Sequence, residues 1–160
     1  MKTTVYIDSS NLHAESRKLG VKIDYNKFFQ WLCKKYDTRV VYLFMGYIPK
    51  NHLIYKRLNS YGYKIIFKET VVLSEINLKI KGNCDADLVL KICRDYYEQN
   101  TDKFVVITGD GDFKCLVNFL LEKSVQIFLL FPSIKSTALL LIESKTNQEC
   151  LEGSYNLFSE

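Results

Sequence analysis

Apolar residues along the chain fall into two kinds of segment that alternate. Short runs of β-branched and aromatic residues predict buried strands, and segments with apolar residues every three or four positions predict helices. The predicted strands are residues 4–7, 39–45, 63–67, 104–108 and 125–131, with a short edge strand at 155–158. The predicted helices are residues 24–36, 51–61, 84–97, 112–123 and 137–143. Residues 70–80 have the mixed pattern of a hairpin or an irregular segment.

This alternation predicts an α/β fold. Several predicted strands are near-continuous apolar runs, such as residues 39–45, which is typical of a mostly parallel sheet covered by helices on both faces. No internal repeat and no interior linker divides the chain, so we expect one domain over residues 1–160. In such sheets ligands bind beyond the carboxyl ends of the strands, so the residues at those ends are the first candidates for a site.

The composition is that of a folded, soluble protein. Of the 160 residues, 48% are hydrophobic and 25% are charged, which excludes wholesale disorder. No apolar run approaches the ~20 residues of a membrane span, and the first residues lack a signal-peptide pattern. Five cysteines without a C-x-x-C pair favour structural thiols over disulfides or a zinc ribbon. We therefore expect a cytoplasmic protein without a membrane partner.

The positive charge is concentrated in one segment. The chain has a formal net charge of +4, and residues 50–81 carry seven cations and only two acids. Tyrosine and phenylalanine residues are interleaved with these cations, a combination that suits a polyanion with stackable bases. A solvated face above core aromatics explains the same composition, so charge alone leaves both interpretations open.

Four aspartates are predicted to lie at the carboxyl edge of the sheet. Asp8 directly follows the first strand, and Asp85 begins a helix on its inward-facing stripe. Asp110 and Asp112 follow the strand at 104–108. Converging carboxylates repel one another unless a cation lies between them, and an all-oxygen set without His or Cys favours Mg²⁺ or Mn²⁺. Each aspartate alone is also a favourable cap or turn residue, but their convergence favours a metal site.

Three other classes of phosphate-binding protein fit the motifs poorly. A dinucleotide-binding G-x-G-x-x-G motif would need a third glycine where this chain has Lys114, and no P-loop motif is present. The chain has the early aspartate and late Gly-Asp-Gly of haloacid-dehalogenase-type phosphatases. Those enzymes need a second acid two positions after the nucleophile, where this chain has Ser10, and a further aspartate after Gly-Asp-Gly, which is missing.

Three blocks of the chain match the pattern of one known family. They are residues 6–12 (YIDSSNL), 81–88 (KGNCDADL) and 106–113 (VITGDGDF). In their order and spacing the chain resembles the NYN domain, a branch of the PIN-like nuclease superfamily, over roughly residues 3–136. The resemblance implies a PIN-like, Rossmann-like fold in the form of a three-layer α/β/α sandwich. It also implies a ribonuclease activity that depends on Mg²⁺ or Mn²⁺.

The resemblance further implies which residues form the metal site. Asp8, Asp110 and Asp112 would bind the metal, and Asp85 would be a further ligand or a base that positions water. All four would form the catalytic acidic cluster.

Four other residues would contact the substrate by the same resemblance. Asn11 would orient water or substrate, and Lys81 would lie beside the site within reach of a phosphate. Ser136 or Thr137, after the last core strand, would place a hydroxyl near the pocket. An exposed loop cation is an equally simple interpretation of Lys81.

The helix that begins near Asp85 departs from the family pattern at one position. Many family members carry another acid about two turns further on, where this chain has Lys91. Asp87 would substitute for that acid, or it would compensate the helix dipole and pair with Lys91 at i,i+4.

The sequence therefore predicts a metal-dependent ribonuclease that hydrolyses RNA phosphodiester bonds, with residues 50–81 holding the RNA backbone. One alternative is a non-catalytic RNA- or protein-binding module that keeps the acidic pocket. Another is a metal-dependent phosphatase that acts on small phosphoesters. Exposed edge strands or tyrosine-rich patches would also support a homodimer.

Overall fold

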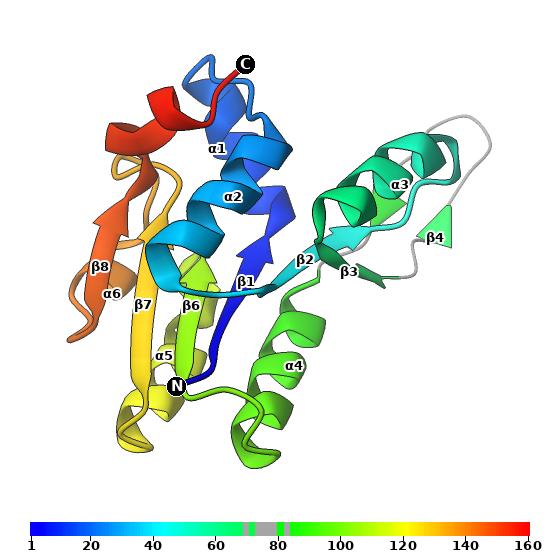
Figure 1. The fold of residues 1–160 in the computed structure, drawn as a ribbon. Helices are drawn as coiled ribbons and strands as arrows, with labels where there is room; N and C mark the ends of the chain where they lie inside the picture. The colour runs from blue at the N-terminus through cyan, green and yellow to red at the C-terminus, as the bar shows by residue number, and fades with distance from the viewer. Residues whose placement is uncertain (69–70, 73–79, 82–83) are drawn as a thin grey trace.

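The computed structural model describes residues 1–68, 71–72, 80–81 and 84–160. Within these residues, a six-stranded sheet has the strand order β3-β2-β1-β6-β7-β8, and every pairing in it is parallel (Figure 1). Its strands are β1 (Thr3–Asp8), β2 (Val40–Gly46), β3 (Lys64–Lys68), β6 (Lys103–Ile107), β7 (Gln126–Phe131) and β8 (Asn147–Cys150). A separate antiparallel pair consists of β4 (Val71–Val72) and β5 (Ile80–Lys81).

Six α-helices and three short 3₁₀ segments connect the described strands. The α-helices are α1 (Ser9–Lys18), α2 (Tyr25–Tyr36), α3 (His52–Tyr61), α4 (Asp85–Tyr97), α5 (Lys114–Glu122) and α6 (Leu139–Ile142). The 3₁₀ segments are η1 (Pro49–Asn51), η2 (Gly111–Phe113) and η3 (Leu151–Leu157).

Helices cover both faces of the sheet. Successive residues of β1 alternate between two cores, as the period of two along a strand requires. Val5 and Ile7 face a core shared with α1, α2 and η3, whereas Tyr6 faces a core shared with α4, α5 and α6. In Figure 1, α1 and α2 accordingly lie on one side of the sheet and α5 on the other. The expected three-layer α/β/α sandwich is confirmed.

Local signals in the sequence explain where the helices begin and end. The Asp24 carboxylate accepts hydrogen bonds from the backbone N–H groups of Asn26 and Lys27, which caps the start of α2. Gly62 ends α3 with a φ of 108°, a conformation that side chains disfavour. The predicted helices and the five predicted core strands are confirmed to within a few residues at their ends.

The C-terminal part of the chain differs from the prediction. Residues 155–158 do not form an edge strand, because Leu151, Tyr155 and Phe158 are spaced as on a helix and bury their side chains against the α2 side of the sheet. The edge strand beside β7 is β8, whose polar sequence NQEC lacks the apolar run that identified the other strands of the sheet. Most of the predicted hairpin at 70–80 lies outside the described residues, and β4 and β5 pair at its two ends.

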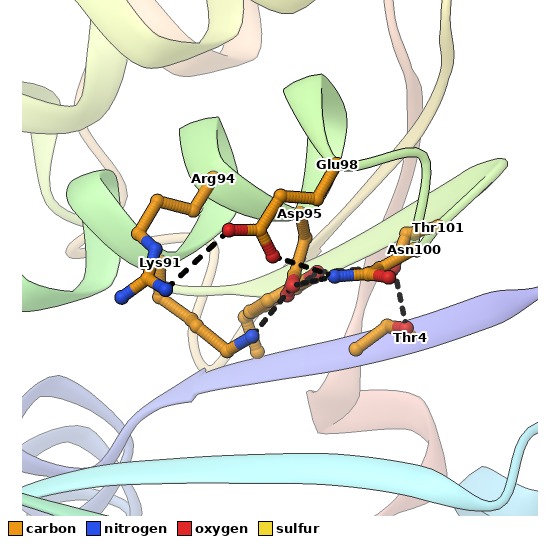
Figure 2. Close-up of polar contacts among 8 residues, drawn as sticks. Thr4, Lys91, Arg94, Asp95, Glu98, Asn100 and Thr101 are labelled. Carbon is orange, nitrogen blue, oxygen red and sulfur yellow. Dashed lines mark hydrogen bonds and ion pairs between the residues drawn. The ribbon is translucent and has the colours of Figure 1, made fainter.

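A buried polar network ties α4 to the centre of the sheet (Figure 2). Asp95 is only 2% exposed, and its carboxylate accepts hydrogen bonds from Tyr6 Oη at 2.8 Å and from Lys91 Nζ at 2.5 Å. The hydroxyls of Thr4 and Thr101 lie 2.7 Å apart beside this pair. Because β1 begins at Thr3 and ends at Asp8, this network lies toward the amino end of β1, away from the predicted site. Among the described residues, no helix combines the length and apolar character of a membrane span.

Candidate functional site

The predicted site residues meet where the sheet changes direction. The chain passes from β1 outward to β2 on one side, and later returns to β6 on the other side of β1. This reversal leaves a crevice at the carboxyl ends of β1 and β6, the usual place for a ligand in an open parallel sheet. Asp8 is the last residue of β1, and Asp110 follows β6 by a short loop. Asp85 is the first residue of α4.

Three carboxylates come together at this crevice. One oxygen from each of Asp85, Asp110 and Asp112 lies within 4.8 Å of the others, and we call these three residues the acidic cluster. Asp85 and Asp110 are half-buried, and Asp112 is exposed. Among the described residues, no other three potential metal ligands converge in this way.

The geometry of the acidic cluster fits a hard divalent cation. Oxygen ligands lie ~2.1 Å from Mg²⁺, so two ligands of one ion can be up to ~4.2 Å apart. A separation of at most 4.8 Å needs only small side-chain rotations to reach that range. Three carboxylates at such distances repel one another, and a bound cation would remove that cost. An all-oxygen donor set favours Mg²⁺ or Mn²⁺ over Zn²⁺.

Asp8 lies beside the acidic cluster but in a different environment. It is 7% exposed, and both of its oxygens accept hydrogen bonds, from Asn11 N at 3.1 Å and from Thr108 Oγ1 at 3.0 Å. Burial raises the pKa of the Asp8 carboxyl, these hydrogen bonds oppose the rise, and the charges of Asp85 and Asp110 add to it. Asp8 is thus both the cap of α1 and a neighbour of the acidic cluster.

The loop after β6 is held in place by short-range hydrogen bonds. Thr108 Oγ1, which donates to Asp8, accepts from the backbone N–H of Asp110 at 3.2 Å. Asp110 Oδ1 in turn accepts from the N–H of Asp112 at 3.0 Å, so Asp110 caps η2. Asp8 and Asp110 are therefore both caps, and Asp110 also belongs to the acidic cluster. Asp8 lies beside the cluster, and its role as a metal ligand stays a prediction. Thr108 is fully buried and was not among the predicted site residues. A polar residue directly after an apolar strand is the feature of the sequence that could have indicated its role.

The glycines of this loop allow it to pack closely against neighbouring segments. A Cβ atom on Gly109 would lie 3.2 Å from Thr137 Oγ1 and 3.5 Å from Asn11 Oδ1. A Cβ atom on Gly111 would lie 2.9 Å from the Cβ of Ala138, a distance that real Cβ atoms do not adopt. These glycines therefore bring the acidic cluster against α1 and the segment before α6.

The predicted substrate-binding residues occupy different positions around this loop. Asn11 Oδ1 accepts from the N–H of Gly109 at 2.8 Å, so half of its amide group is used to hold the loop. Thr137 is buried, and its hydroxyl donates to the carbonyl of Ser133 at 2.5 Å. Ser136 is exposed and its hydroxyl donates to Glu15 on α1. The side chain of Lys81 lies outside the described residues.

The predicted ion pair between Asp87 and Lys91 is wrong. Lys91 pairs with Asp95, one turn further along α4, and its ammonium lies 4.6 Å from the centre of the Tyr42 ring. Asp87 instead pairs with Lys68 of β3 at 3.7 Å. The buried Asp95 carboxylate attracts Lys91 more strongly than the half-exposed Asp87 does, because charge pairs gain most where water is excluded. Neither Asp87 nor Lys91 belongs to the acidic cluster.

The fold and the site together define a class of protein. A parallel sheet in a three-layer sandwich, with an acidic cluster at the crevice beside its first strand, is the arrangement expected of a PIN-like domain. The NYN domain model matches residues 2–148, and the chain belongs to that family. The resemblance found in the sequence is thereby confirmed.

One solved structure shares the fold over nearly its whole length. It is a protein of unknown function from Vibrio parahaemolyticus, with 19% sequence identity and a TM-score of 0.76. The alignment covers 99% of this chain and 96% of that one. At this identity the likeness shows the fold alone. No curated protein matches the chain.

Proposed function

We propose that this protein is a ribonuclease that hydrolyses RNA phosphodiester bonds with Mg²⁺ or Mn²⁺. The observation that carries the proposal is the acidic cluster, in which oxygens of Asp85, Asp110 and Asp112 lie within 4.8 Å of one another. Its position at the reversal of strand order and the nuclease-like character of the NYN family support the same assignment.

In this proposal the acidic cluster holds the metal. A bound ion would lower the pKa of a water molecule and offset charge on the phosphodiester. The protein's own task is to keep Asp85, Asp110 and Asp112 at a fixed separation, although they come from α4 and from the loop after β6. Asp8 supports the cluster by joining the ends of β1 and β6 through Thr108.

The other predicted site residues are proposed to act on the substrate. The Asn11 oxygen holds Gly109, which leaves the amide nitrogen as the group that would donate to water or to a phosphate oxygen. Ser136 and Thr137 donate their hydroxyl hydrogens within the protein, so they would accept from the substrate or position the loop. Lys81 is proposed to contact a phosphate, and residues 50–81 to hold the RNA backbone.

The proposal is tested by incubating labelled single-stranded RNA with the protein in Mg²⁺, Mn²⁺ or EDTA. We expect cleavage in either metal, none in EDTA, and none with Asp110→Asn. Asparagine still caps η2 well, so this variant should keep its fold. Asp37→Asn is the matched control, because Asp37 ends α2 far from the crevice with a φ of 48°, which asparagine tolerates.

Each other outcome identifies a different function. RNA binding without cleavage in any metal would contradict the ribonuclease and favour a non-catalytic binding module. Hydrolysis of mononucleotides but not of RNA would favour a phosphatase. Equal activity of Asp110→Asn and the unmodified protein would place the chemistry elsewhere.

The number of domains and the oligomeric state of the protein are also proposals. We infer that residues 1–160 act as one domain, and that the edge strands β3 and β8 are the places where a homodimer would form. Sedimentation at several protein concentrations tests this. The cytoplasmic location stays a prediction.

A further inference from the structure

A cavity of about 540 Å³ opens on the α1 and α2 side of the sheet. It lies among α1, α2, α3 and the end of β2, and its volume is within the ~300–1,000 Å³ of ordinary ligand pockets. Its floor and walls are largely apolar and are formed by Val21, Ile23, Tyr25, Met45 and Leu58. We call this space the α1–α3 cavity.

The rim of the α1–α3 cavity carries positive charge. Arg17 and Lys22 line it, together with His13. Lys22 forms an ion pair with Glu160, which also lies on the rim. Arg17 is exposed and has no ion pair among the residues that the structure describes. An apolar interior beside an unpaired guanidinium suits a ligand with a flat apolar part and an anionic group.

The α1–α3 cavity is connected to the acidic cluster through the sheet and through α1. Asp8 pairs in register with Phe44 of β2, and the next residue, Met45, lines the cavity. The cavity and the cluster are therefore at the same edge of the sheet, on opposite faces. Helix α1 begins at Ser9, directly after Asp8, and at 1.5 Å per residue it reaches His13 after ~6 Å and Arg17 after ~12 Å.

We propose that the α1–α3 cavity binds a nucleobase of the RNA strand, and that Arg17 contacts the phosphate attached to that nucleotide. The inference rests on the proposed ribonuclease function for the identity of the strand. Tyr25 and the apolar wall accept the face of the base, and the His13 ring at the rim can stack on it. The hydroxyl of Ser16, the polar side chain of the floor, already donates to the carbonyl of His13. Recognition therefore depends on the presence of a base more than on its identity.

Direct binding is tested on the unmodified protein in EDTA, so that no metal contributes. Amide NMR spectra are recorded during titration with AMP, with UMP and with ribose 5-phosphate, which lacks a base. We expect both nucleotides to shift the amides of Gly20, Val21 and Ile23, and ribose 5-phosphate to leave them unchanged. Equal shifts with ribose 5-phosphate would mean that the rim binds only an anion. Shifts with octanoate but not with nucleotides would mean that the cavity takes an amphipathic acid. Either result overturns the proposal.

Cleavage kinetics test the role of the cavity during turnover. Arg17→Glu reverses the charge at the rim, and Ser16→Leu fills the cavity from its floor. We expect each to raise KM for RNA about tenfold, the lower range for losing one stacked base, with kcat within about twofold. Lys34→Glu is the control, because it changes the net charge by the same amount as Arg17→Glu. Lys34 is exposed on α2 and does not line the cavity. Unchanged KM in Arg17→Glu would overturn the proposal.

The two proposals fail separately. Cleavage with an unchanged KM in both cavity variants would contradict the proposed base-binding site and leave the ribonuclease assignment intact. If nucleotides shift the amide signals of Gly20, Val21 and Ile23 but RNA is not cleaved, the cavity is a nucleotide site and the ribonuclease assignment is wrong. If Ser16→Leu fails to fold, Arg17→Glu and the spectra still decide the outcome.

Discussion

Asn11 and Gly109 join the first helix to the loop that carries Asp110 and Asp112 of the acidic cluster. The side-chain Oδ1 of Asn11, in the first turn of α1, accepts a hydrogen bond from the backbone N–H of Gly109 at 2.8 Å. The two residues are 98 positions apart in the chain. Asp110 directly follows Gly109, so its position relative to Asp8 depends on this contact.

We expect Asn11→Ala to lower RNA cleavage by about 10- to 100-fold, as the loss of a residue that orients metal ligands commonly does. The substitution also leaves the N–H of the buried Gly109 without its acceptor, at a cost of about 1–3 kcal/mol. Cleavage rates and urea unfolding measure the two effects. Asn118→Ala, on the exposed side of α5, should change neither of them. Full activity in Asn11→Ala would show that the loop keeps its position without this bond.

Two aspartates on the first turn of α4 should behave differently. Asp85 belongs to the acidic cluster, whereas Asp87 pairs with Lys68. We expect Asp85→Asn to lower cleavage at least about 100-fold, because a ligand matters at least as much as the residues that orient it. Asp87→Asn should stay within about threefold, because Asp87 lies outside the acidic cluster and its half-exposed ion pair with Lys68 contributes at most about 1 kcal/mol. Both variants are compared by cleavage rate and by Mn²⁺ binding. Equal losses in the two would contradict the cluster as we define it.

Lys91 should contribute to stability and not to catalysis. Its ammonium lies 2.5 Å from Asp95 Oδ1, and the Asp95 side chain is 3% exposed. We expect Lys91→Glu to destabilise the protein by about 3 kcal/mol, because it leaves a buried carboxylate without its partner beside a second negative charge. Although this change restores the acid that many family members carry, it should not raise the cleavage rate. A faster variant of unchanged stability would show that position 91 serves the acidic cluster. Urea unfolding and initial rates distinguish the two results.

The contact between α1 and the segment before α6 should depend on pH. Hydrogen bonds from Lys18 and then from Ser136 lower the pKa of the Glu15 carboxyl in the folded protein. The unfolded chain has the ordinary glutamate pKa of about 4.3. The stabilisation that the ionised Glu15 carboxylate contributes is therefore complete above pH ~4.3, and it is lost as the pH falls through the lower pKa of the folded protein.

The test of Glu15 compares the unmodified protein with Glu15→Gln. We expect the variant to be less stable by about 1 kcal/mol at pH 7, the value of a typical hydrogen bond, with a difference that shrinks below pH ~4. Thermal unfolding across this pH range measures it. Glu122→Gln is the matched control, because Glu122 is exposed at the end of α5 and takes no part in the contact between α1 and the segment before α6. A difference that grows on acidification would have the wrong sign.

The strands and helices were predictable because the burial of one face gives each element a characteristic spacing of apolar residues along the sequence. Residues 40–45 and 127–131 are apolar on both faces and β-branched or aromatic in large part, which favours buried strands. Asp24 and Gly62 mark helix ends by their own chemistry. The polar edge strand β8 has no such period, because it contacts the sheet on one side only. Residues 155–158 were misinterpreted because a short apolar run is compatible with either structure.

By itself, the sequence determined the α/β class and placed four aspartates at the carboxyl edge, since both follow from local pattern, and the resemblance of three blocks of residues indicated the family. Only the tertiary structure decided that Asp85 joins Asp110 and Asp112 while Asp8 is buried beside them. That grouping depends on the order of strands in the sheet and on which side chains take up each oxygen. The partner of Lys91 was decided in the same way, because the strength of a charge pair depends on the exclusion of water from around it. The α1–α3 cavity is formed where three helices leave space between them, and no run of residues in the chain encodes it locally.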